Sequence, residues 1–103
     1  MTLVILVYQF CKELPPDEKY GLQSQLKRCS VSIPSNIAEG KMRSTKKDFI
    51  YFLRNALGSS AELETHLLLS EKLFTLSVNQ MLIVNTEVQK MLFTLINKLT
   101  PNT

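Results

Sequence analysis

The sequence has few of the residues that build disulfide or metal scaffolds. Its 103 residues include 2 cysteines, 1 histidine and no tryptophan. Cys11 and Cys29 form no CxxC pair, and His66 has no cysteine at the spacing of a zinc site, so neither metal nor cofactor is expected. We interpret the two cysteines as small core residues in a reducing, cytoplasmic compartment; a disulfide between the first two helices is the alternative.

Long apolar runs are also absent. The apolar stretch at residues 2–8 is far shorter than the roughly 20 residues that span a bilayer. It lacks the basic region and the cleavage site of a signal peptide, so it is interpreted as the start of a helix, and no membrane association is expected. There is no low-complexity segment and no internal repeat. The length suits one domain, residues 1–103, with a single modest core.

The stretch from Gly21 to Gly40 predicts the central helix. Apolar residues recur there at steps of four, three, four and four, namely at Leu22, Leu26, Cys29, Ile33 and Ile37. Pro34 lies inside this stripe, where a proline typically costs about 3 kcal/mol, and three flanking serine hydroxyls are available to satisfy freed backbone groups. We interpret the stretch as one helix kinked at Pro34, with two short helices as the alternative, and Gly40 as a left-handed stop residue.

Three further helices are predicted, over residues 2–13, 45–73 and about 77–99. Thr45 with Asp48, and Ser77 with Gln80, are interpreted as capping boxes at the starts of the last two. Gly58, in a run of small residues, is predicted to allow close packing against the serines of the second helix. Short connections between four helices indicate an all-α protein, an antiparallel up-down-up-down four-helix bundle.

Two motifs in this pattern, YGLQSQLKRCSVSIPSNIAEG and ALGSSAELET, resemble those of the four-helix-bundle proteins known as 23S rRNA intervening-sequence proteins. The resemblance covers about residues 10–73. It implies the bundle fold and assembly into a ring-shaped homopentamer. One branch of these proteins serves as an accessory factor to a reverse transcriptase in diversity-generating retroelements and presents basic residues to nucleic acid. Family members usually carry about ten residues more at the start, so the first helix is expected to be truncated, or Met1 to be an alternative start.

Positive charge is concentrated in one part of the chain. The segment between Lys27 and Arg54 holds seven basic and two acidic residues, whereas the remainder holds five basic and seven acidic ones. Such a segment attracts polyanions, although a solvated helix face is an equally good interpretation. The candidate nucleic-acid-binding residues are the seven cations of this segment: Lys27, Arg28, Lys41, Arg43, Lys46, Lys47 and Arg54.

Residues suited to catalysis form no recognisable pattern. A pairing of His66 with Glu62, four positions earlier, is one interpretation, but a lone surface or half-buried histidine is the preferred one. A di-metal bundle site requires Glu-x-x-His pairs, which the chain lacks. Gln25, Asn36 and Glu39 are polar positions that would fix helix register if buried. No catalytic residue and no metal ligand is predicted.

These observations favour a non-enzymatic, oligomeric protein that binds the backbone of structured RNA or duplex nucleic acid. A role as accessory to an RNA-processing or reverse-transcribing machine is one form that this function could take. A structural or protein–protein adaptor is the alternative. Self-association is expected because the helices carry more apolar positions than one bundle needs. The surplus set is Val4, Ile5, Ile50, Leu82, Ile83 and Ile96.

Overall fold

Four α-helices make up most of the chain in a computed structural model, which describes residues 1–101. They are α1 (Thr2–Cys11), α2 (Leu22–Lys41), α3 (Lys46–Phe74) and α4 (Asn79–Leu99), with a short 3₁₀ turn, η1 (Pro16–Glu18), before α2. Residues 1–101 contain no strand. The predicted all-α fold with four helices is therefore confirmed.

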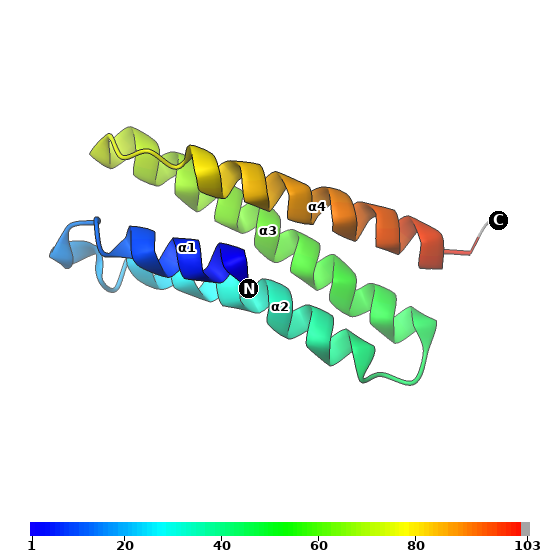
Figure 1. Cartoon of the computed structure of the whole chain (residues 1–103). Helices are drawn as coiled ribbons and strands as arrows, with labels where there is room; N and C mark the ends of the chain where they lie inside the picture. The colour runs from blue at the N-terminus through cyan, green and yellow to red at the C-terminus, as the bar shows by residue number, and fades with distance from the viewer. Residues whose placement is uncertain (102–103) are drawn as a thin grey trace.

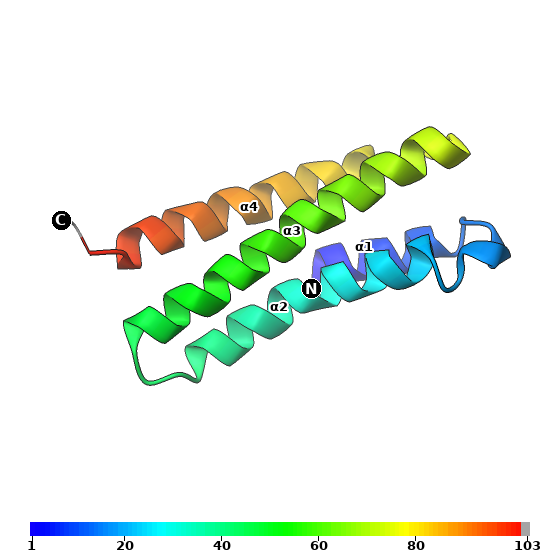
Figure 2. The same cartoon turned by 180° about the vertical axis from the view of Figure 1, so that it is seen from behind.

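The helices form an elongated bundle in which the chain reverses direction at each connection (Figure 1). α3 lies between α2 and α4, and the α2–α3 pair forms the most extensive contact between two helices. α1 lies along only the first part of α2 (Figure 2), and it contacts both α2 and α4. The Cα atoms extend over 47 × 21 × 19 Å.

The core is built from apolar side chains at helical spacing. Leu26, Cys29 and Ile33 of α2 are buried, and α3 contributes the fully buried Leu53 and Leu63. Burial of a leucine of this kind stabilises a protein by about 1.5–3 kcal/mol, so these stripes hold the helices together. Val7 and Phe10 of α1 and Leu92 and Ile96 of α4 also belong to the core. Ile96 was expected among the surplus apolar residues, and that expectation is wrong because the residue faces the core.

The first helix leaves part of its neighbours uncovered. α1 has 10 residues and α4 has 21, corresponding to lengths of roughly 15 and 31 Å. Near the N-terminus, a hollow of about 320 Å³ lies between α2 and α4. Its lining is mostly apolar and includes Ile33, Pro34, Leu53, Leu92 and Leu95. The short first helix thus exposes apolar surface that a longer helix would bury.

α2 continues through Pro34 without a break, as the apolar stripe predicts. Pro34 has no N–H, so the Ser30 carbonyl lacks its usual helical donor. The nearby polar side chains do not replace that donor, because they bond to other carbonyls. The Ser30 hydroxyl donates to the Lys27 carbonyl at 3.0 Å, and the Asn36 amide donates to the Ser32 carbonyl at 2.8 Å. The kink itself stays a prediction.

Two glycines serve purposes different from those expected. Gly40 lies inside α2 without a positive φ, so the prediction of a left-handed stop is wrong. A Cβ placed on Gly40 would lie 2.9 Å from Phe49 Cδ1 and 2.9 Å from Phe52 Cβ, so this glycine lets α3 approach α2 closely. Gly58 is exposed, and a Cβ there would meet nothing within 4 Å. Its predicted role in close packing is therefore wrong.

The helix ends agree with the sequence at one of the two predicted caps. The Thr45 hydroxyl accepts a hydrogen bond from the Asp48 backbone N–H at 3.1 Å, which confirms the cap of α3. The N-cap of α4 is Val78 and has no side-chain hydrogen bond, so the predicted cap at Ser77 is wrong. α3 ends at Phe74, and its C-cap Thr75 is the one non-glycine residue of the described chain with a positive φ (55°).

A buried polar pair joins α3 to α4. The Ser60 hydroxyl donates to Asn85 Oδ1 at 2.6 Å, and Asn85 Nδ2 donates to the Ser60 carbonyl at 2.9 Å. Both residues are almost fully buried. The sequence had suggested Gln25, Asn36 and Glu39 for such a role, but the first two are only half-buried and Glu39 is exposed.

We expect opposite effects from alanine at the two glycines. Gly40→Ala should destabilise the protein by about 1–3 kcal/mol because the new methyl group overlaps two phenylalanine side chains. Gly58→Ala should stabilise it by up to about 1 kcal/mol because alanine favours a helix and has free space there. Urea unfolding of both variants measures the two free energies. Equal effects would contradict the packing role of Gly40.

Removal of the buried amide should also destabilise the bundle. Asn85→Ala leaves the Ser60 hydroxyl buried without its acceptor, with an expected loss of about 1–3 kcal/mol. Asn97→Ala, at an exposed position of the same helix, is the matched control and should change stability by less than about 0.5 kcal/mol. Thermal unfolding followed by circular dichroism compares the two variants. Similar midpoints would show that the buried pair contributes little.

Candidate nucleic-acid interface

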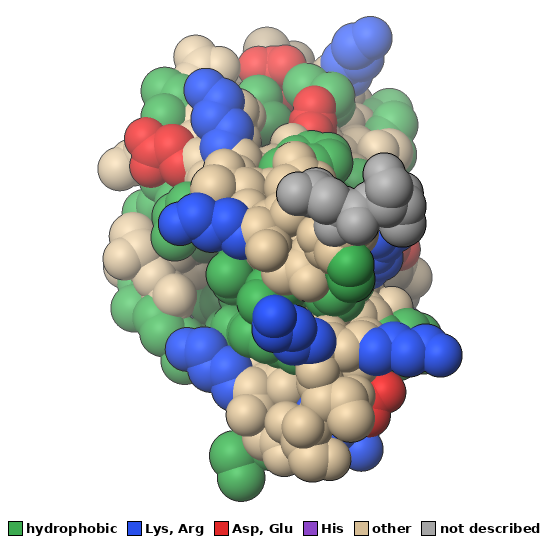
Figure 3. All heavy atoms as spheres, turned by 90° about the vertical axis from the view of Figure 1, so that its right-hand side faces the viewer, with side chains coloured by type: hydrophobic (Ala, Val, Ile, Leu, Met, Phe, Trp, Pro, Cys, Tyr) green, Lys and Arg blue, Asp and Glu red, His purple; other side chains and the backbone are tan. Residues whose placement is uncertain are grey.

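Several cations gather where α2 ends and α3 begins. Lys41 is the last residue of α2, Arg43 lies in the connection, and Lys46 and Lys47 open α3; all four are exposed. The last turn of α4, with Lys98, lies at the same end of the bundle (Figure 1). Figure 3 looks onto this end and shows Lys and Arg side chains spread over it. We call Lys41, Arg43, Lys46, Lys47 and Lys98 the basic end.

Lys98 did not emerge from the sequence because it lies outside the charged segment. The signal that identifies it is topological: when the chain reverses at each connection, the end of the fourth helix lies at the same end of the bundle as the connection between the second and third. A charge in the last turn of α4 therefore adds to charges that lie about 50 residues earlier.

The cations of the basic end differ in whether a carboxylate or an aromatic ring of the same chain contacts them. Arg43 is held by the Glu39 carboxylate at 3.4 Å, and its guanidinium lies 4.8 Å from the centroid of the Phe52 ring. Within residues 1–101, no carboxylate forms an ion pair with Lys41, Lys46 or Lys47. These three ammonium groups are exposed and available to an anionic ligand.

Arg54 lies apart from the basic end. It is exposed, but eight residues separate it from Lys46, which places it roughly 12 Å further along α3. It therefore lies on the side of the bundle.

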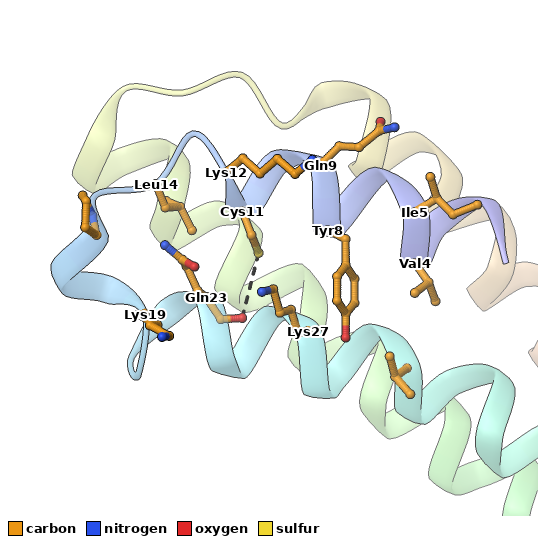
Figure 4. Close-up of a pocket in the computed structure, with 12 residues that line it drawn as sticks. Val4, Ile5, Tyr8, Gln9, Cys11, Lys12, Leu14, Lys19, Gln23 and Lys27 are labelled. Carbon is orange, nitrogen blue, oxygen red and sulfur yellow. Dashed lines mark hydrogen bonds between the residues drawn. The ribbon is translucent and has the colours of Figure 1, made fainter.

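The structure does not bring Lys27 and Arg28 to the basic end either. They precede Lys41 by at least thirteen residues, a distance of roughly 20 Å along α2. Lys27 points into a hollow of about 720 Å³ beside α1 (Figure 4), with its Nζ 5.1 Å from the centroid of the Tyr8 ring. Arg28 lines a separate hollow with Gln25. The seven predicted residues thus divide among several surfaces.

A group of reactive side chains lies away from the basic end, between α2 and α3. One donor atom from each of Cys29, Glu62 and His66 lies within 4.8 Å of the other two. The sequence did not reveal this group because Cys29 belongs to another helix. Burial, and then the neighbouring Glu62, raise the pKa of the Cys29 thiol to about 12. A thiol in this state is a poor nucleophile at neutral pH, so the group does not resemble an activated cysteine–histidine pair.

No helix within residues 1–101 combines the length and the apolar character needed to cross a membrane.

Comparisons with known proteins agree with the helical architecture. The family model described as 23S rRNA-intervening sequence protein matches residues 1–97. The chain is also similar to a crystal structure of a protein of unknown function from the S23 ribosomal protein family of Bacteroides thetaiotaomicron. The two share 27% sequence identity with a TM-score of 0.80, and the match covers 92% of each chain. No curated protein matches the chain.

Proposed function

We propose that this chain, which belongs to the family of 23S rRNA-intervening sequence proteins, is a non-enzymatic protein that binds structured RNA or duplex nucleic acid through its basic end. The observation that carries the proposal is the set of exposed ammonium groups of Lys41, Lys46 and Lys47, none of which has a carboxylate partner within residues 1–101. Such groups neutralise phosphates and release counterions, which supplies affinity without sequence recognition.

The composition of the basic end favours contacts to the nucleic-acid backbone over contacts to bases. Recognition of single strands depends on aromatic rings that stack on bases. Residues 41–48 contain no aromatic side chain, and the ring of Phe52 is already covered by Arg43. A duplex or a folded RNA, whose phosphates form a continuous surface, is therefore the better ligand.

Self-association is the second part of the proposal. Exposed apolar side chains line one helix, with Ile83, Met91 and Phe93 of α4 at 61%, 70% and 54% exposure. Burying them against other copies of the chain would remove apolar surface from water. A ring, pentameric by the family resemblance, would repeat the basic end around its axis. Several weak contacts would then act together on one long polyanion, as suits an accessory to an RNA-processing or reverse-transcribing machine.

A protein–protein adaptor is the alternative function. The same apolar side chains of α4 suit a partner protein as well as another copy, and in that case the positive charge would serve only solubility. The two functions differ in whether the lysines of the basic end contribute to binding.

Charge reversal at the basic end should strongly weaken nucleic-acid binding. In Lys46→Glu/Lys47→Glu, we expect affinity for a structured RNA to fall more than tenfold at low salt, because two phosphate contacts become repulsions. The slope of log affinity against log salt should flatten by about 1.5–2 for the same reason. Filter binding at several salt concentrations measures both quantities.

The matched control for that variant is Lys12→Glu/Lys19→Glu. It makes the same change in net charge at exposed positions near the opposite end of the bundle. The control should retain most of the affinity of the parent. Equal losses of affinity in the two variants would show that net charge alone causes the effect. A parent protein that does not bind nucleic acid at low salt would favour the adaptor function.

The parent protein should form an oligomer in solution. Light scattering at micromolar concentration should give a mass several times the 11.8 kDa of one chain. Ile83→Asp/Met91→Asp should reduce that mass while circular dichroism keeps its helical signal, because both side chains are exposed. Tyr20→Lys, at an exposed apolar position ahead of α2, is the control. A monomeric parent would contradict the assembly.

A further inference from the structure

The group formed by Cys29, Glu62 and His66 has the composition of a metal site. Its thiol sulfur, carboxylate oxygen and imidazole nitrogen lie within 4.8 Å of one another. Glu62 and His66 are one turn apart on the same face of α3, with His66 Nε2 at 3.6 Å from Glu62 Oε2. Cys29 faces them from α2. Four-residue spacing on α3, combined with a ligand from a neighbouring helix, replaces the Glu-x-x-His pattern that the sequence lacks.

His66 provides an independent indication. Both of its ring nitrogens are buried, and neither has a hydrogen-bond partner within the described chain. A buried polar atom without a partner destabilises the folded state, so a native protein seldom keeps one without a reason. A bound cation would satisfy one nitrogen, and the side chain is held where it can do so.

We propose that Cys29, Glu62 and His66 together bind one Zn²⁺ ion, with a water molecule in the fourth position. Nitrogen and sulfur ligands beside one carboxylate suit this borderline-soft ion better than Mg²⁺ or Ca²⁺, which prefer oxygen. Three protein ligands and one open position form a known arrangement for zinc.

The distances need only a small adjustment. A tetrahedral Zn²⁺ with ligands at about 2.0–2.3 Å separates its donor atoms by about 3.3–3.8 Å. The nitrogen–oxygen distance of 3.6 Å already falls in that range, and because every pair lies within 4.8 Å, no pair must close by more than about 1.5 Å. Glu62 is exposed, so rotation of its side chain can bring its carboxylate closer to the other two donor atoms without disturbing the core.

The surroundings of the group give the ion access from solvent, and two of the ligands balance the charge of the ion. A hollow of about 170 Å³, lined by Gln25, Arg28, Ser32 and Ser59 as well as Cys29 and Glu62, leads to the group. On binding, the Cys29 thiol loses its proton to solvent and forms the sulfur–zinc bond. The thiolate and the carboxylate then neutralise the two charges of the ion, so the nearby Arg28 guanidinium faces a neutral complex.

The site would join α2 to α3 near the middle of the bundle. Both helices already pack closely there, and the Ser32 and Ser59 hydroxyls are 2.7 Å apart one turn away. The metal would therefore act as a cross-link between helices, and binding should raise thermal stability because the unfolded chain does not hold the three ligands together.

Cobalt binding tests the site directly. Titrating the metal-free full-length protein with Co²⁺ should produce a sulfur-to-cobalt charge-transfer band in the near ultraviolet, saturating at one ion per chain. The band should disappear in Cys29→Ala and persist in Cys11→Ala, which removes the other buried cysteine. Zn²⁺ should displace cobalt, and it should raise the melting temperature of the parent and of Cys11→Ala.

Two further variants keep the test decisive if Cys29→Ala folds poorly. His66→Gln and Glu62→Gln change residues that are not part of the apolar core, and each should weaken cobalt binding at least tenfold. They should also lose most of the rise in melting temperature. Absence of the band in the parent, or an undiminished band in His66→Gln, would overturn the proposal.

Discussion

The close approach of α2 to α3 is the constraint on which the rest of the structure depends. It is made possible by the absence of a side chain at Gly40, against which Phe49 and Phe52 pack, and by the short serine side chains in the middle of the pair. This approach fixes the connection between the helices and thereby gathers four cations at one end of the bundle. It also brings Cys29 within reach of two side chains of α3.

The sequence predicts most features that depend on one helix at a time, although the cap expected at Ser77 is absent. The stripe through Pro34, the cap at Thr45 and the number of helices follow from local spacing and local hydrogen bonds. Gly40 was misassigned because a glycine near a helix end suits both a left-handed turn and a close contact, and only the neighbouring helix decides between them. The prediction for Gly58 was wrong for a different reason. Helical periodicity alone did not show that this position faces away from the neighbouring helices.

The candidate sites depend on how helices meet, so the sequence predicted them only in part. Cations adjacent in the chain, such as Lys46 and Lys47, were found by charge counting, whereas Lys98 required knowledge of which helix ends coincide. Lys27 and Arg28 are near those cations in sequence but distant along the helix axis. The Cys29–Glu62–His66 group required the pairing of α2 with α3, and spacing within a single helix does not contain that information.

The short α1 gives the two halves of the bundle different local stability. The half near η1 has four helices, whereas toward the basic end only α2, α3 and α4 continue (Figure 1). Segments with fewer buried contacts open at lower free energy than the global unfolding of the protein. Backbone amides of the basic end should therefore exchange with solvent sooner than those beside α1. The positive charge thus lies on the half of the molecule in which fewer helices pack against one another.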